Sequence, residues 1–285
     1  MYETSLLVLY LNQFPSNRSE QTAHNGAVFL APCVTACVGL NHSYECNMLE
    51  FRVRPSACLS QSRLQSMFEI PIHVIDFEGS RQSGVVEYGY VTLAQGEIVD
   101  AQTRICAPVG TISDMDRGQH GISELRALKE APFTAEWSLF AKLRETGALC
   151  AHNASVEEGF LRAVWPCPRT SPDFSEPGLS TASWGPWLDT LQIYRRLYPD
   201  LPSHKLQNLI ECFDLQVALD QQAATLCPPE RSHYHCALYD ALASALLLQH
   251  LTEAPGLGEA SLRWLFLQSA PSDAARTAMG QQEFF

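Results

Sequence analysis

The 285-residue chain contains no apolar run of about 18 residues, so we expect no membrane-spanning helix and no membrane partner. Its ten cysteines include no C-x-x-C pair, the usual spacing of a structural zinc site, and we expect reduced thiols in a cytoplasmic protein. Basic residues are few, 19 Lys and Arg against 31 Asp and Glu, and the net charge of −12 argues against a simple basic nucleic-acid-binding domain. A carboxylate site that binds divalent cations can still bind phosphate, so nucleic acid is not excluded.

Residues 1–66 differ from the rest of the chain. They contain four basic and four acidic residues, and they show no sustained helical or strand period. We expect a poorly ordered N-terminal extension; a second interpretation is that Met67 is the true start of the protein. The apolar stretch at residues 27–40 follows a long polar segment of mixed charge, which does not fit a signal peptide, so export is not expected.

From Met67 onward the pattern predicts an α/β domain over residues 67–254, followed by a C-terminal tail at residues 255–285. Three strands separated by hairpin-like turns come first, at residues 70–77, 85–93 and 97–106. Helices and short strands then alternate, which predicts a mixed sheet with helices on both faces. The expected helices cover residues 123–130, 135–145, 155–164, 190–197, 205–213, 236–251 and 259–268, and the short strands residues 148–151 and 187–189.

A proline-rich loop at residues 166–186 interrupts this alternation with five prolines. A loop of this length is typical of a lid or a binding segment. Trp184 lies within it and has two interpretations, stacking on a base or packing of the loop onto the domain body, of which we favour packing.

The first residues with chemical character are Asp76 and Glu78, at the end of an apolar strand. Residues two apart on a strand point to the same face, so both carboxylates project together. Two such charges repel unless a cation or a proton lies between them. Without further evidence, an ordinary solvent-facing strand end would explain the pair.

A second acidic position follows the short strand at residues 148–151. Asn153 is suited to cap the next helix, and Glu157 shares its face with Phe160 and Leu161. A buried acid needs a partner. We therefore expect Glu157 to be functional and Glu158 to be solvated.

The third segment contains His235 and, five residues later, Asp240. If one helix carried both, their side chains would lie about 140° apart at 100° per residue. Both can therefore serve one site only if His235 lies on the loop before the helix, where it would suit proton transfer near pH 7. His233 is the competing candidate.

Taken together, these three segments resemble the motifs of the DEDDh 3′→5′ exonucleases, the DnaQ-like family that includes the proofreading subunit of bacterial DNA polymerase III and RNase T. The intervening segments at residues 120–123, 131–133, 189–191 and 203–206 resemble this family too, so the resemblance covers about residues 71–251. It implies an RNase H-like fold, a five-stranded mixed sheet flanked by helices. It also implies a 3′→5′ exonuclease that acts on single-stranded DNA or RNA 3′ ends and releases nucleoside 5′-monophosphates.

The resemblance also implies roles for individual residues. Two divalent ions, Mg²⁺ or Mn²⁺, would be held by the four acids, and His235 would accept a proton during hydrolysis. The expected metal ligands are Asp76, Glu78, Glu157 and Asp240. The expected contacts to the terminal nucleotide are Gly79, Ser80, His120 and Asn153.

The sequence departs from the family at two positions. Glu157 stands where the family usually has Asp, which implies an adjusted metal spacing with activity retained. Gly79 stands where a Thr commonly follows the first motif, so one hydroxyl near the 3′ end is missing.

Residues 281–285 loosely resemble the short motif that binds the bacterial sliding clamp, although a frayed tail explains them as well. The alternative function is a non-catalytic protein with a degenerate exonuclease fold that binds nucleic acid or acts as an adaptor for polymerase or clamp. The resemblance also leaves a homodimer open, because many relatives pair. The complete set of four acids and His235 favours the enzyme.

Overall fold

The computed structural model describes residues 67–254, 257 and 260–281. All described residues belong to one compact unit. The predictions for residues 1–66 and for the clamp-like motif, apart from Gln281, fall outside the described part. None of the helices in this part has the length and apolar character needed to span a bilayer.

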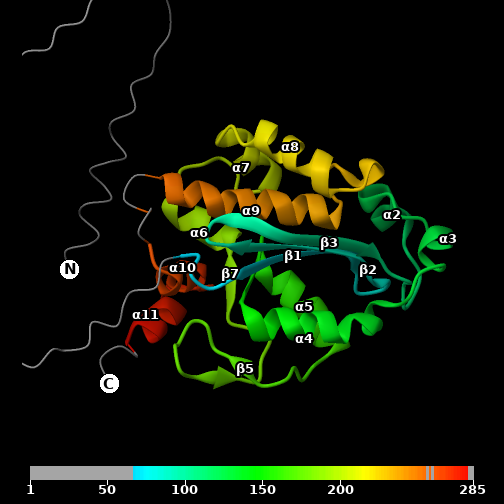
Figure 1. The fold of residues 1–285 in the computed structure, drawn as a ribbon. Helices are drawn as coiled ribbons and strands as arrows, with labels where there is room; N and C mark the ends of the chain where they lie inside the picture. The colour runs from blue at the N-terminus through cyan, green and yellow to red at the C-terminus, as the bar shows by residue number, and fades with distance from the viewer. Residues whose placement is uncertain (1–66, 255–256, 258–259, 282–285) are drawn as a thin grey trace, which may run out of the picture. The chain divides into compact units, whose positions relative to one another are not determined.

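Five strands form the central sheet in the order β3-β2-β1-β4-β7 (Figure 1). The hairpin strands β1 (Ile72–Ser80), β2 (Gly84–Ala94) and β3 (Glu97–Ile105) pair antiparallel. The short strands β4 (Ala148–Ala151) and β7 (Trp187–Asp189) extend the sheet in parallel from β1. The predicted mixed five-stranded sheet is confirmed, and β1 lies at its centre.

Helices cover both faces of this sheet. The long helix α9 (Ala237–Glu253) lies along one face, with α7 (Leu206–Cys212) and α8 (Gln216–Leu226) outside it (Figure 1). On the opposite face lie α4 (Trp137–Thr146) and α5 (Ala154–Val164). The remaining helices are α2 (Asp114–His120), α3 (Glu124–Ala127), α6 (Thr190–Leu197), α10 (Leu262–Ser269), α11 (Asp273–Gln281) and the 3₁₀ turns at Phe133–Glu136 and Pro229–Arg231.

The core on the α4–α5 face is aromatic. Phe77 from β1 packs against Phe133, Phe140 and Phe160, with ring centroids 5.2 to 6.0 Å apart. Trp184 is only 1% exposed, so the packing interpretation of this residue is confirmed.

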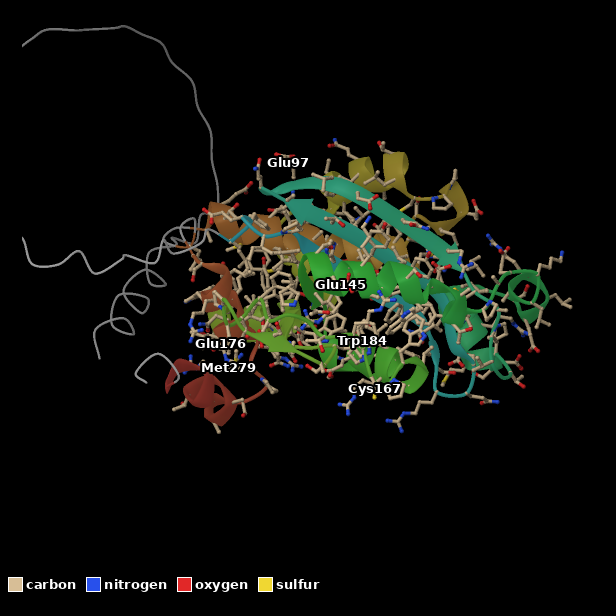
Figure 2. All side chains as sticks on the ribbon, turned by 60° about the horizontal axis from the view of Figure 1, so that its bottom comes forward. Glu97, Glu145, Cys167, Glu176, Trp184 and Met279 are labelled. Atoms are coloured by element: carbon tan, nitrogen blue, oxygen red, sulfur yellow. The ribbon has the colours of Figure 1, made fainter. Side chains whose placement is uncertain are left out.

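The indole N–H of Trp184 donates to the carbonyl of Trp165 at 2.8 Å, which fixes the proline-rich loop against the body. Figure 2 shows Trp184 within the packed side chains and Cys167 at the rim of the domain. Arg144 adds three hydrogen bonds to loop carbonyls, including those of Pro172 and Gly185 at 2.9 Å each. The loop also contains a short β5–β6 pair, Ser171–Pro172 with Ser180–Thr181.

Some predicted elements were wrong in extent. The helix expected at residues 123–130 is a single turn at Glu124–Ala127, because its apolar side chains Leu125 and Leu128 are exposed and give a longer helix no buried face. The helix expected at residues 259–268 is α10, which begins three residues later, at Leu262. The tail also contains α11, which the sequence did not predict.

Candidate metal centre and active site

The first two acids lie within the central strand β1, beyond its pairing with β4, and not at the strand end that the sequence predicted: Asp76 pairs with Gly89 and Glu78 with Glu87 of β2. Glu78 is buried, and one carboxylate oxygen of Asp76 is buried without a hydrogen-bond partner. A bulge falls between Glu78 and Gly79, and Gly79 has φ +145°, a region that favours glycine. A Cβ at Gly79 would lie 2.1 Å from the carbonyl oxygen of Gly84. The backbone therefore requires glycine where the family commonly has Thr.

Glu157 lies in the first turn of α5 and is 4% exposed. The predicted side-chain cap by Asn153 is wrong, because Asn153 adopts a left-handed conformation (φ 75°) and its side chain does not cap the helix. Asp189 at the end of β7 caps the helix instead, because its carboxylate accepts from the backbone N–H groups of Asn153 and Ala154, at 3.1 Å each. This contact orients α5 and so the Glu157 carboxylate. Glu158 points elsewhere and lies 3.9 Å from Arg162.

His235 lies on the loop that precedes α9, as the sequence analysis required. It has a left-handed backbone (φ 65°) and an exposed side chain, and its backbone N–H donates to Asp240 at 3.0 Å. The Gln119 amide nitrogen lies 3.1 Å from His235 Nδ1. The competing His233 bonds the carbonyl of Tyr234 at 2.8 Å and is not part of the acidic cluster.

The structure brings three of the five predicted site residues within ligand distance of one another. Ligand atoms of Glu78, His235 and Asp240 all lie within 4.8 Å of one another. Asp76 and Glu157 are not members of this group, although the charges of Asp240, Glu78 and Glu157 all raise the pKa of Asp76. Buried oxygens without a partner are Asp76 Oδ2, Glu157 Oε2 and Asp240 Oδ1.

Burial raises the pKa of all four predicted metal ligands, and neighbouring carboxylates add to this rise. Burial is the main cause for each, and it raises the pKa of Glu78 and of Glu157 to about 8. The pKa of Asp240 rises to about 7 by burial, although the His235 backbone N–H partly opposes this. The pKa of Asp76 lies well above its ordinary value through burial and then through the neighbouring carboxylates.

This donor set fits hard divalent cations. Carboxylate oxygens are preferred ligands of Mg²⁺ and Mn²⁺, and a cation would compensate charges that are otherwise both buried and repulsive. The three orphaned oxygens would also gain the partners that buried polar atoms require.

The predicted nucleotide contacts lie in different surroundings. Ser80 remains at the site edge, with its hydroxyl 3.1 Å from that of Ser83. Asn153 lines a groove beside Asp240. His120 is 2% exposed, and its Nδ1 accepts from the Ile122 N–H at 3.1 Å, so its ring packs inside rather than facing a hollow.

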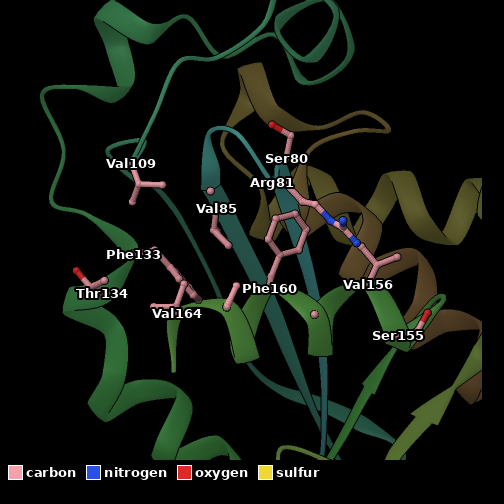
Figure 3. A pocket seen from close by; sticks show the side chains of 13 residues that line it. Ser80, Arg81, Val85, Val109, Phe133, Thr134, Ser155, Val156, Phe160 and Val164 are labelled. Atoms are coloured by element: carbon pink, nitrogen blue, oxygen red, sulfur yellow. The ribbon is translucent and has the colours of Figure 1, made fainter. Parts of the chain in front are cut away.

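An apolar hollow of about 870 Å³ lies between the β1–β2 turn and α5. Figure 3 shows Phe160 rising from α5 toward Ser80 and Arg81, with Val109 on another wall. Two of its lining residues, Ser80 and Val156, lie within two positions of Glu78 and Glu157 in the chain. Its side chains suit a flat apolar group such as a nucleobase. The lining is Ser80, Arg81, Gly84, Val85, Val109, Phe133, Thr134, Ser155, Val156, Gly159, Phe160, Ala163 and Val164.

Sequence reasoning missed the ion pair behind this site. Arg231 donates to both carboxylate oxygens of Glu87, through Nε at 3.0 Å and through Nη2. Glu87 also accepts from the Ala237 N–H at 3.0 Å, and Arg231 donates to the carbonyls of His120 and His235. The sequence offered one indication of this pair: Glu87 is the only acid in the predicted strand at residues 85–93, and a buried acid requires a partner.

The chain was compared with known proteins. It is 29% identical over 180 residues to DNA polymerase III PolC-type of Halalkalibacterium halodurans, which covers 59% of this chain and 10% of that protein. It is 28% identical over 178 residues to the Bacillus subtilis protein of the same name, and the match covers 61% of this chain and 11% of that protein. The chain thus spans about a tenth of the length of these curated relatives. No protein-family model matches the chain.

Solved structures show the same architecture. Exonuclease I from Methylocaldum szegediense matches with a TM-score of 0.52 at 15% identity, covering 75% of this chain and 46% of that one. The zinc-bound complex of E. coli exonuclease I with single-stranded DNA matches with a TM-score of 0.51 at 15% identity, covering 75% and 45%. At this level of identity the likeness concerns the fold.

The sheet order, the flanking helices and these neighbours therefore define an RNase H-like fold of the kind found in exonucleases. Within that class the chain resembles the DnaQ-like 3′→5′ exonucleases, as its three motifs predicted.

Proposed function

We propose that the chain is a metal-dependent 3′→5′ exonuclease that releases nucleoside 5′-monophosphates from single-stranded DNA or RNA ends. The observation that supports the proposal is a buried acidic group. Ligand atoms of Glu78, His235 and Asp240 lie within 4.8 Å of one another, and one buried carboxylate oxygen each of Asp76, Glu157 and Asp240 has no hydrogen-bond partner. The single-stranded DNA bound to E. coli exonuclease I supports a nucleic-acid strand as the substrate class.

The acids would hold two ions, Mg²⁺ or Mn²⁺. Bound there, the ions supply Lewis-acid stabilisation of charge on the phosphate and on the leaving 3′-oxygen. The residues that would hold them are Asp76, Glu78, Glu157 and Asp240.

His235 would accept the proton of the attacking water. Partial burial and then His233 lower its pKa, so the neutral imidazole is available near pH 7. For Nε2 to accept, Nδ1 must carry the hydrogen, and the Gln119 amide beside it must then present its oxygen. The His235 backbone bond to Asp240 holds the base beside the acids.

The apolar hollow would receive the terminal base. Val156 and Phe160 provide its apolar wall on the side of Glu157, and Ser80 contributes a hydroxyl at its rim. The scissile phosphate would then lie over the carboxylates.

A 5′-labelled single-stranded oligonucleotide with Mg²⁺ or Mn²⁺ tests the proposal. We expect stepwise shortening from the 3′ end that stops with EDTA and in the Asp76→Asn and Glu157→Gln variants. Glu158→Gln is the matched control, because Glu158 has the same charge one residue away but lies outside the cluster. Binding without shortening by the unmodified chain would favour the non-catalytic adaptor. Equal shortening by Asp76→Asn would place the activity elsewhere.

A further inference from the structure

A second hollow, which we call the polar groove, opens at His235 and Asp240 and shares no lining residue with the apolar hollow. It has a volume of about 870 Å³ and reaches the cluster directly, because His235 and Asp240 form part of its lining. Arg195 from α6 and Lys205 at the start of α7 form another part.

The charge of this groove is opposite to that of the chain. Asp240 is the single acidic residue in its lining, whereas Arg195 and Lys205 are both cationic and exposed. Acids outnumber bases by 31 to 19 over the whole chain. Among the residues that the structure describes, neither cation forms an ion pair. Two unneutralised cations beside an acidic centre therefore form a local anion-binding surface.

The backbone that carries Lys205 is held in place. His152 donates through Nε2 to the His204 carbonyl at 3.0 Å, and its Nδ1 accepts from the Thr190 hydroxyl at 2.9 Å. Burial lowers the pKa of His152 to about 4, so the ring stays neutral and keeps this pattern. His204 in turn donates to the Tyr198 carbonyl at 2.9 Å. The loop before α7 is thus fixed beside the site in advance of any ligand.

We propose that the polar groove binds the sugar–phosphate backbone of the nucleotides preceding the scissile bond, with Arg195 and Lys205 contacting their phosphates. This inference rests on the proposed function and assigns the two hollows to different parts of one strand. The apolar hollow takes the terminal base, which needs no cation. The polar groove takes the phosphates on the 5′ side of the scissile bond, which the net charge of the chain would otherwise repel.

The test compares two double variants of the full chain that lose the same charge. Arg195→Ala/Lys205→Ala removes the groove cations. Lys142→Ala/Arg162→Ala removes two exposed cations from α4 and α5 that line neither hollow. Hydrolysis of a twelve-residue oligothymidylate is measured beside that of thymidine 5′-(p-nitrophenyl phosphate), which has no preceding nucleotide. Fluorescence anisotropy of the labelled oligonucleotide in EDTA gives binding against salt.

We expect the groove variant to lose about tenfold in kcat/KM on the oligonucleotide, equivalent to about 1.4 kcal/mol, and nothing on the ester. Its salt slope should fall by about 1.4, or about 0.7 for each lost phosphate contact, with no change in the control. Equal losses on both substrates, equal losses in both variants, or no binding by the unmodified chain in EDTA would overturn the inference. Failure of the unmodified chain to hydrolyse either substrate would instead refute the proposed function, while the anisotropy comparison still tests the groove.

Discussion

The Glu87–Arg231 pair gives a sharp prediction about stability. Both side chains are almost fully buried, at 1% and 5% exposure, and the carboxylate accepts from Arg231 and from the Ala237 N–H. Glu87→Gln keeps the shape but leaves the Arg231 charge buried without a counter-charge. We expect a loss of about 3–5 kcal/mol in the free energy of unfolding.

Urea denaturation followed by tryptophan fluorescence measures this loss. The control is Glu230→Gln at the exposed Arg126–Glu230 pair, where the side chains are 46% and 58% exposed and we expect a change of less than about 1 kcal/mol. A loss in Glu87→Gln no larger than in the control would refute the reasoning.

A companion variant separates stability from positioning. Glu87→Leu/Arg231→Met removes both charges, so it should be far more stable than Glu87→Gln. Because Arg231 also donates to the His235 carbonyl at 3.3 Å, the double variant should still lose oligonucleotide hydrolysis through a lower kcat. Unchanged kcat in this variant would mean that the pair does not position the loop.

Two further outcomes follow from the site. Burial raises the pKa of Glu78 and Glu157 to about 8 and of Asp240 to about 7, so the folded chain retains protons that the unfolded chain releases. The melting temperature in EDTA should therefore fall as the pH rises from about 5 to about 8. Added Mg²⁺ or Mn²⁺ should raise the melting temperature most near pH 8. A melting temperature that changes with neither pH nor metal would contradict this reasoning. Gly79→Ala should lower the free energy of unfolding, measured by urea denaturation, by about 1–3 kcal/mol, because Gly79 has a positive φ and lies close to the Gly84 carbonyl. Gly118→Ala, at a helix position with open space around it, should leave this free energy unchanged or raise it. Equal effects of the two variants would contradict the strain argument.

Local patterns predicted the sheet and the motif-bearing segments well. Residues 85–93 are rich in β-branched and aromatic side chains apart from Glu87 and Gly89, and the burial of this strand follows from that composition. The loop position of His235 was predictable because the angle to Asp240 on a helix excluded the alternative.

Long-range polar partners were not predictable. Glu87 and Arg231 are 144 residues apart, and the sequence around either residue does not indicate which residue is its partner. The prediction of the α5 cap was wrong for the same reason: the local sequence suggested the Asn153 side chain, whereas the carboxylate of the distant Asp189 accepts from the backbone N–H groups. The helix α2 was missed because its seven residues carry no apolar period and depend on the Ser113 cap.

The contact between Asp189 and the start of α5 has a consequence for how this chain tolerates change. Because β4 pairs directly with β7, and Asp189 grips the amides of Asn153 and Ala154, the geometry of Glu157 is set without help from the intervening residues 166–186. The exposed turn at residues 177–180 within that stretch can therefore be lengthened or exchanged while Trp184 stays packed and the Glu157 carboxylate keeps its position, which makes this turn a suitable place for a new binding segment.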